Sequence, residues 1–285
     1  MPGLDAPWRL GYPIAMTIPP IIYGTAWKED STAGLTRKAV IAGFRGIDTA
    51  NQKKHYREDY VGDALLELKG LGISREDLFL QSKYTYQDGQ DHRLPYDPDA
   101  DFGTQARSSF ANTLLNLHTD YLDSYLLHGP SSSVGISDAD WEVWSAMENL
   151  HESGQARIIG VSNANLNQVR ELCDKARIKP MTVQNRCYAI RGWDMAVREY
   201  CLAHKIVYQG FSLLTANPHV VGNPRVSAIA RRLQATAAQV ILRFAVQIGI
   251  LPLTGTKDAQ HMKDDLEIVN IELSADDVST IYSIA

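Results

Sequence analysis

Four polar residues stand where a parallel α/β barrel would carry its chemistry. They are Asp48, Tyr56, Lys83 and His128. An acid, a phenol, an amine and an imidazole that converge can hand a proton to a carbonyl oxygen while a hydride arrives from another molecule. The first hypothesis is therefore that these four side chains form one site.

Three of these residues close short apolar runs that predict consecutive β-strands. The runs are Ile41–Ile47 before Asp48, Leu78–Ser82 before Lys83, and Tyr121–Leu127 before His128. Tyr56 lies on the loop after Asp48, before an amphipathic helix. Active sites of parallel barrels lie at the carboxyl ends of the strands, so the four side chains are expected at one end of the barrel.

The whole chain alternates short β-branched runs with helical patterns, which predicts a parallel sheet with crossover helices. The predicted strands are Ile21–Thr25, Phe44–Asp48, Leu78–Lys83, Tyr121–His128, Ile158–Val161, Thr182–Gln184, Ile206–Gly210 and Gly249–Leu253. The predicted helices are Val61–Leu71, Thr104–Leu117, Asp138–Ser153, Leu166–Lys175, Asp194–His204 and Ala235–Val246. Eight strands of this kind close into a (β/α)8 TIM barrel. We expect one domain over residues 1–285, because no linker-like stretch divides the chain.

Composition excludes several classes of protein. The 285 residues carry 45% hydrophobic and 21% charged residues, which is ordinary for a soluble globular protein. The net charge of −5 argues against nucleic acid or an anionic membrane as partner. No apolar run reaches the ~18 residues of a membrane span. Prolines interrupt the apolar N-terminal stretch, so no signal peptide is expected, and the three widely spaced cysteines suggest reduced thiols in a cytoplasmic protein.

A series of motifs resembles the signatures of the aldo-keto reductases, in the family's order from about Ile21 to the C-terminus. The motifs are Gly46-Ile47-Asp48-Thr49-Ala50, Leu78–Lys83, Tyr121–His128, Ile159-Gly160-Val161-Ser162-Asn163, Val183-Gln184-Asn185 and Leu253-Thr254-Gly255-Thr256. The resemblance implies an NAD(P)H-dependent oxidoreductase that reduces a small aldehyde or ketone. A monomer or weak homo-oligomer is expected.

The resemblance also implies roles for the four polar residues. Tyr56 would donate the proton, and Lys83, held by Asp48, would lower the pKa of the phenol by favouring its charged form. His128 would donate a hydrogen bond to the substrate oxygen as a neutral imidazole. Each residue alone has an ordinary structural explanation, such as a helix cap or a solvated strand end.

The choice of phenol is open. The family pattern has a tyrosine five residues after the aspartate, where this chain has Lys53. Counting backward from Val61-Gly62 leads to His55 or Tyr56. Tyr60 is the other phenol, but it is expected on the first turn of the helix. Tyr56 is the preferred proton donor, and the alternatives are Tyr60 or the absence of a catalytic phenol.

The implied cofactor is a nicotinamide dinucleotide bound without a Rossmann fold, and no GxGxxG follows a predicted strand. Ser162, Asn163 and Gln184 would bind the carboxamide, and Phe211 would stack on the nicotinamide. The full implied cofactor set is Gly24, Thr25, Asp48, Ser162, Asn163, Gln184, Phe211, Ser212, Leu214, Thr215, Thr254, Gly255, Thr256, His261 and Asp265. The expected substrate pocket comprises Trp27, Tyr56, His128 and Gly129, and no metal is expected.

The sequence departs from the family at the cofactor's phosphate end. Leu253 stands where a lysine is common, and His261 where an arginine is frequent. Lys257 and Lys263 are possible substitutes. We therefore expect NADPH to be preferred over NADH, but only modestly, with NADH not excluded.

Two of the connections between the predicted strands and helices are long. The connection Tyr86–Asp101 is expected to overhang the site and shape substrate choice, or else to be a disordered surface loop. The connection Ala216–Pro224 is expected over the cofactor.

One alternative to a reductase is a non-catalytic nucleotide-binding barrel that acts as a redox-sensing or regulatory subunit. Another is a metal-dependent hydrolase that uses His55, His128 and Asp48, which lacks the usual ligand spacing.

Overall fold

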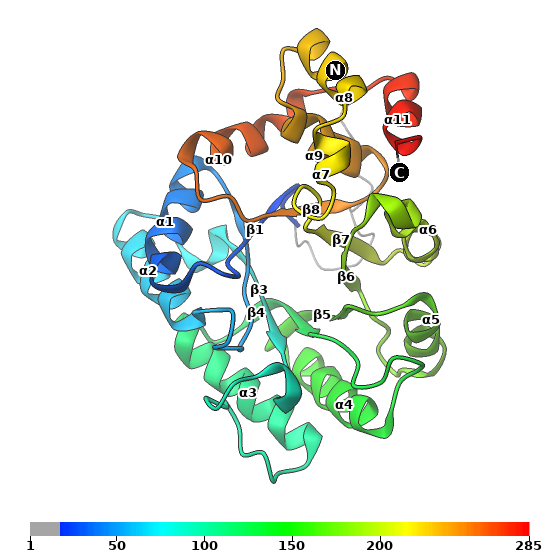
Figure 1. Ribbon diagram of the computed structural model, residues 1–285. Coiled ribbons are helices and arrows are strands. Elements are labelled where there is room, and N and C mark those ends of the chain that lie inside the picture. The colour runs from blue at the N-terminus through cyan, green and yellow to red at the C-terminus, as the bar shows by residue number, and fades with distance from the viewer. Residues whose placement is uncertain (1–17, 285) are drawn as a thin grey trace. The chain divides into compact units, whose positions relative to one another are not determined.

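The structure is a computed structural model that describes residues 18–284. Its eight strands follow one another in chain order, from β1 to β8, as a closed barrel (Figure 1). By its internal contacts the chain divides into two compact units. The first unit is Tyr23–Val183, and the second comprises residues 18–22 and 184–284 of the described chain.

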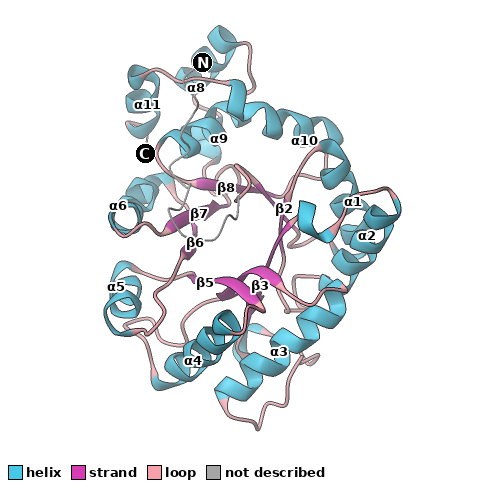
Figure 2. Cartoon of the chain, turned by 180° about the vertical axis from the view of Figure 1, so that it is seen from behind, coloured by secondary structure: helices cyan, strands magenta, loops and turns pink. Residues whose placement is uncertain are grey.

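The first unit holds the strands and helices from the end of β1 to the start of β6. They are β1 Ile22–Gly24, α1 Thr32–Ala42, β2 Gly46–Asp48, α2 Glu58–Gly70, β3 Phe79–Tyr84, α3 Phe102–Leu117, β4 Leu122–Leu127, α4 Asp138–Glu152, β5 Ala156–Ser162, α5 Leu166–Lys175 and β6 Thr182–Arg186. Figure 2 shows α3 and α4 on the outer side of β3 and β5.

The second unit continues the pattern with more helices than strands. It contains α6 Met195–Ala203, β7 Val207–Phe211, α7 Pro218–Val221, α8 Pro224–Leu233, α9 Ala237–Gln247, β8 Leu251–Thr254, α10 Ala259–Leu266 and α11 Ala275–Tyr282. Its strands β7 and β8 pair in parallel, with Gln209 opposite Leu251.

Parallel register sets the positions of the polar side chains in the first unit. Asp48 on β2 pairs with Gln81 on β3, and Lys83 pairs with Leu126 on β4. Successive side chains of a strand point to opposite faces, so Gln81 and Lys83 share one face of β3 while Ser82 lies on the other. The register therefore brings Asp48, Gln81 and Lys83 together on one face.

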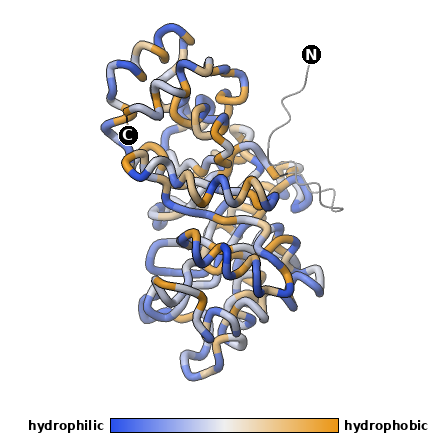
Figure 3. Tube along the Cα trace, turned by 90° about the vertical axis from the view of Figure 1, so that its right-hand side faces the viewer, coloured by the Kyte–Doolittle hydropathy of each residue, from blue (hydrophilic) through white to orange (hydrophobic). Residues whose placement is uncertain are grey.

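Several helices begin with a reciprocal cap that their sequence encodes. The Ser137 side chain accepts from the Asp140 backbone, and Asp140 accepts from the Ser137 backbone in return. The same arrangement starts α5 with Asn165 and Gln168, and α9 with Thr236 and Gln239. Along the helices, hydrophobic residues alternate with hydrophilic ones (Figure 3), as expected for elements that bury one face.

The eight strands and the barrel predicted from the sequence are confirmed, with two corrections. Ile41 belongs to the end of α1 and not to a strand, because that helix ends at Gly43, whose φ of 128° suits glycine. Lys83 does not close its strand, since β3 continues through Tyr84. The sequence patterns had left α1 unpredicted. The single-domain organisation stays a prediction.

No helix in residues 18–284 is long and apolar enough to cross a membrane. Most of the N-terminal stretch on which the expected absence of a signal peptide rests, including Pro13, lies outside the described residues.

Candidate active site

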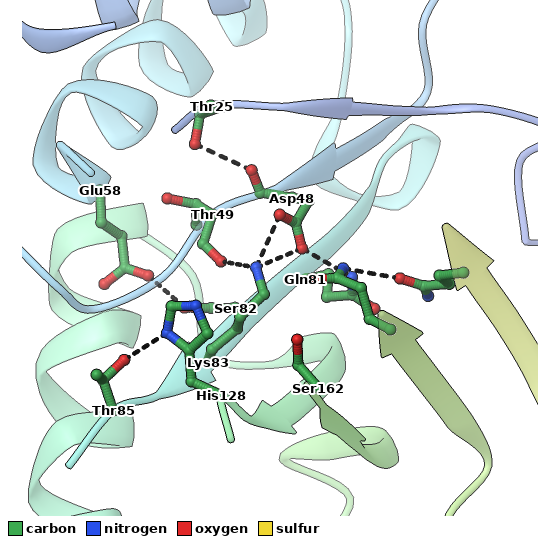
Figure 4. Close-up of polar contacts among 12 residues, drawn as sticks. Thr25, Asp48, Thr49, Glu58, Gln81, Ser82, Lys83, Thr85, His128 and Ser162 are labelled. Atoms are coloured by element: carbon green, nitrogen blue, oxygen red, sulfur yellow. Dashed lines mark hydrogen bonds and ion pairs between the residues drawn. The ribbon is translucent and has the colours of Figure 1, made fainter. Parts of the chain in front are cut away.

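A buried ion pair between Asp48 and Lys83 forms the centre of the candidate site (Figure 4). Lys83 Nζ lies 2.6 Å and 2.7 Å from the two carboxylate oxygens, and 2.8 Å from the backbone oxygen of Thr49. The two residues are 3% and 0% exposed, respectively. Burial lowers the pKa of Lys83, and the adjacent Asp48 opposes that shift. The carboxylate is thus what retains a charged ammonium inside the protein.

Neighbouring strands hold Asp48 in position. Gln81 Nε2 donates to Asp48 Oδ1 over 2.8 Å, from the residue that faces it in the β2–β3 register. Thr25, just after β1, donates both its backbone N–H and its hydroxyl to the backbone oxygen of Asp48. The carboxylate therefore has a fixed direction at the end of β2.

Tyr56 is the phenol beside this pair. Lys83 Nζ lies 5.3 Å from the centroid of the Tyr56 ring, and the rings of Tyr56 and His128 are 6.0 Å apart at 70°. Tyr60 lies within α2, and the guanidinium of Arg57 covers its ring at 3.4 Å. The geometry thus brings Tyr56, and not Tyr60, next to Lys83.

The pKa of Tyr56 departs from the expectation based on sequence. Burial, and after it the charge of Asp48, raise the pKa of the Tyr56 phenol well above its ordinary value. These two effects outweigh the lowering that was expected from the charge of Lys83. The phenol therefore keeps its proton at neutral pH and can act as a donor.

His128 follows β4 and is held from both sides. Its Nδ1 lies 2.6 Å from the hydroxyl of Thr85, and its backbone oxygen accepts from Asn163 Nδ2 over 2.8 Å. Burial, and then the positive charge of Lys83, lower the pKa of His128 to about 3. The imidazole is consequently neutral at physiological pH.

The expected substrate pocket has an exposed aromatic wall and an open position. Trp27 is 61% exposed and holds a positive φ of 60°, with its ring 3.8 Å from that of His55. At Gly129, a Cβ would meet only ordinary contacts, the nearest at 3.6 Å from Asn163. No steric conflict within the structure demands glycine there, so its effect is to leave room next to His128.

The connection Tyr86–Asp101 packs against the loop that carries Tyr56. Gln52 Nε2 donates to the backbone oxygen of Gly89, and Gln90 Nε2 donates to that of Asn51. Arg93 reaches the backbone oxygen of Lys53. The segment is therefore ordered against the site loop, and its role in substrate choice stays a prediction.

Sequence reasoning missed Glu58, a buried carboxyl directly behind Lys83. The hydroxyl of Ser82 donates to Glu58 Oε1 over 2.5 Å, and Asn116 Nδ2 donates to Oε2 over 3.2 Å. Burial raises the pKa of Glu58, while these hydrogen bonds oppose the rise. A glutamate in the first turn of a helix is common, so the sequence gave no sign that Glu58 is buried and accepts hydrogen bonds from Ser82 and Asn116.

The expected cofactor residues are divided between the two units. In the first unit, Ser162 is the last residue of β5 and Asn163 follows it. Asn163 adopts a φ of 53° and donates to the hydroxyl of Ser162. In the second unit, Gln184 Nε2 donates to Gln209 Oε1 over 2.9 Å. The remaining expected residues of that unit lie at the last positions of β7 and β8 and on the segments that follow these strands: Phe211, Ser212, Leu214, Thr215, Thr254, Gly255, Thr256, His261 and Asp265.

The segment after β7 is anchored by a buried amide that the sequence did not reveal. Asn217 Oδ1 accepts from the backbone of Ala189, and its Nδ2 donates to the backbone oxygens of Cys187 and Leu213. Ser212 holds a φ of 57° at the start of this segment. The connection Ala216–Pro224 thus begins from a fixed turn and contains α7.

A metal site finds no support in the geometry. Among residues 18–284, no group of three or more histidine, cysteine, aspartate or glutamate side chains is arranged to hold a metal ion. His55, His128 and Asp48 therefore do not form the centre that the hydrolase alternative requires.

Comparison with known proteins defines the class. A sequence model described as "Aldo/keto reductase family" matches residues 20–285. The glyoxal reductase of Bacillus subtilis is 31% identical over 246 residues, covering 86% of this chain and 80% of that protein. Prostaglandin F synthase 1 of Bos taurus is 27% identical over 296 residues, covering 93% of this chain and 87% of that protein.

A solved structure agrees. The crystal structure of an aldo-keto reductase enzyme from a deep-sea metagenome library superposes with a TM-score of 0.81 and 25% identity, covering 94% of this chain and 92% of that chain. The chain belongs to the aldo/keto reductase family. This membership supports an oxidoreductase on a (β/α)8 barrel.

Proposed function

We propose that the protein reduces the carbonyl group of a small aldehyde or ketone to an alcohol, with a reduced nicotinamide dinucleotide as electron donor. The observation that carries this proposal is the buried Asp48–Lys83 pair with Tyr56 and His128 beside it. The carbonyl carbon takes up a hydride, which the bound cofactor supplies, and the carbonyl oxygen takes up a proton from the protein.

The proton is proposed to come from the hydroxyl of Tyr56. Because the pKa of this phenol is raised, it stays protonated until negative charge develops on the substrate oxygen. The resulting phenolate would stand near the Lys83 ammonium, whose charge favours it. His128, as a neutral imidazole, would donate a hydrogen bond that orients the same oxygen.

Each unit contributes groups that suit a dinucleotide. A carboxamide needs paired donors and acceptors, and Ser162, Asn163 and Gln184 are proposed to supply them. The ring of Phe211 offers a flat surface for the nicotinamide. Gly24, Thr25 and the segments Ser212–Thr215 and Thr254–Thr256 are proposed to complete the site. NADPH and NADH carry the same hydride and differ only in a 2′-phosphate on the adenosine ribose.

A screen of small aldehydes, glyoxal among them, tests this function by following the absorbance of the reduced nicotinamide. We expect turnover by the wild-type chain and by Tyr60→Phe, and turnover reduced by about 10²–10⁴-fold in Tyr56→Phe. Nucleotide binding without turnover of any carbonyl compound would instead favour the redox-sensing or regulatory subunit.

A further inference from the structure

The segment after β8 holds carboxylates where a phosphate would be expected. In (β/α)8 barrels, the loops after the seventh and eighth strands and the N-terminus of a short helix frequently bind phosphate. Here that helix is α10, Ala259–Leu266, and it follows β8 after a short loop. The first backbone amides of α10 and the nearby hydroxyl of Thr254 already have hydrogen-bond partners within the protein.

Asp258 occupies the N-terminus of α10. Its Oδ1 accepts from the backbone N–H groups of Gln260 and His261, over 2.8 Å and 2.9 Å. These two hydrogen bonds lower the pKa of Asp258, so the side chain is a charged carboxylate at neutral pH. The amides that would receive a phosphate are thus taken by an anion.

Thr254 is committed in the same way. Its hydroxyl donates to Asp265 Oδ2 over 2.6 Å, and Asp265 is only 3% exposed. Burial raises the pKa of Asp265 to about 6, so the carboxyl is still mostly ionised at pH 7.5. The Thr254 hydroxyl then has no proton left for a phosphate, and a negative charge lies beside it.

Cations do not compensate for these carboxylates. Leu253 is buried and apolar, whereas His261, Lys257 and Lys263 are exposed. Within the described part of the chain, no lysine or arginine forms an ion pair with Asp258 or Asp265. Exposed lysines on a flexible stem attract a phosphate only weakly and in a salt-dependent way.

We propose that Asp258 and Asp265 make this end of the site select against a 2′-phosphate, so that the protein takes NADH in preference to NADPH. The inference rests on the proposed function, since it concerns the cofactor of that reaction. In the NAD sites of Rossmann folds, a carboxylate accepts a hydrogen bond from the 2′-hydroxyl of the unphosphorylated ribose, and the same chemistry is available here. It revises the modest NADPH preference expected from the sequence.

Equilibrium binding of NADH and NADPH, measured by quenching of tryptophan fluorescence at low salt, tests the proposal independently of turnover. We expect the wild-type chain to bind NADH about tenfold or more tightly than NADPH. The preference should shrink as salt is raised, because repulsion of the phosphate is screened.

Three variants assign the effect. Asp258→Ser keeps a helix cap without the charge, and Asp265→Asn keeps an acceptor for Thr254 without the charge. Each should move the affinity ratio toward NADPH by several-fold, and their combination by more. Asp264→Asn is the matched control, since it removes the same charge from α10 but its side chain pairs with Gln260. Its ratio should change little.

The outcomes separate the two proposals. Equal affinities in the wild-type chain, or tighter NADPH binding, would overturn the NADH preference while leaving the proposed reduction intact. An equal shift in Asp264→Asn would overturn the assignment to Asp258 and Asp265. Failure to bind either dinucleotide would overturn the proposed function and this inference together.

Discussion

The Lys83 ammonium donates three hydrogen bonds, two to the carboxylate oxygens of Asp48 and one to the backbone oxygen of Thr49. The N–O distances are 2.6, 2.7 and 2.8 Å. No proton remains for a hydrogen bond to Tyr56. Lys83 can therefore act on the phenol only through its charge, from 5.3 Å to the ring centroid. The two residues therefore act together. Asp48 keeps the amine of Lys83 charged, and that charge stabilises the Tyr56 phenolate once the proton has left.

Lys83→Met should remove carbonyl reduction while changing the affinity for the dinucleotide by less than about tenfold. It should also destabilise the protein by about 3–5 kcal/mol, because it leaves Asp48 as a buried charge without its partner. Urea denaturation measures the loss. Lys83→Met combined with Asp48→Asn should recover much of the stability and none of the activity. Lost nucleotide binding with an intact rate in the bound state would contradict the role given to Lys83.

Tyr56→Phe should fold normally and lose about 10²–10⁴-fold in kcat/KM, the usual contribution of a positioned general acid. Tyr60→Phe is the matched control, because Tyr60 lies on α2 under Arg57 and away from Lys83. Steady-state kinetics with one aldehyde suffice. Normal rates in Tyr56→Phe with inactivity in Tyr60→Phe would reverse the choice of phenol.

The pH dependence follows from His128. Its pKa falls from about 6.5 in the unfolded chain to about 3 in the folded protein. Between these values only the unfolded chain binds the proton, so the free energy of unfolding should fall as pH drops from about 6.5 toward 3. Denaturation curves across this range check the slope, which His128→Gln should reduce. The rate of carbonyl reduction should show no acidic loss near pH 6.5.

The sequence indicated Asp48, Lys83 and His128 because each lies at or next to the carboxyl end of a barrel strand. It could not give their partners. Whether the hydroxyl of Thr85 meets His128 depends on the loop path after β3, and whether Ser82 meets Glu58 depends on how α2 packs behind that strand. Neither leaves a periodic signal.

The misassigned strand residue has a simple cause. An apolar run that includes Ile41 looks the same at the end of a helix and in a buried strand. Gly43, which ends α1 with a positive φ, was the local mark of the boundary. The sequence could not show which polar groups are available where the cofactor's phosphate is expected, because the hydrogen bond from Thr254 to Asp265 is visible only in the structure.

Glu58→Ala should cost about 1–3 kcal/mol of stability, because it leaves the buried hydroxyl of Ser82 without its acceptor and removes the hydrogen bond from Asn116. Glu58→Gln retains an acceptor for Ser82 and should cost less. Thermal unfolding of both variants measures the difference. Equal stability of the wild-type chain and Glu58→Ala would show that water replaces the carboxyl in this layer.

Thr85 should determine which nitrogen of His128 carries the proton. A neutral imidazole has one N–H, and it can donate to the substrate oxygen through Nε2 only if Nδ1 accepts. The 2.6 Å contact lets the Thr85 hydroxyl donate to Nδ1, which fixes the tautomer needed for the proposed role. Thr85→Val retains the shape and removes the donor, so kcat should fall by about tenfold or more while the protein stays folded. Thr85→Ser, which restores a hydroxyl, should recover most of the rate.

Nitrogen-15 chemical shifts of the His128 ring provide the direct measurement: the proton should be on Nε2 in the wild-type chain and in Thr85→Ser, and distributed over both nitrogens in Thr85→Val. A wild-type ring with its proton on Nδ1 would mean that His128 accepts a hydrogen bond in the site and does not donate one.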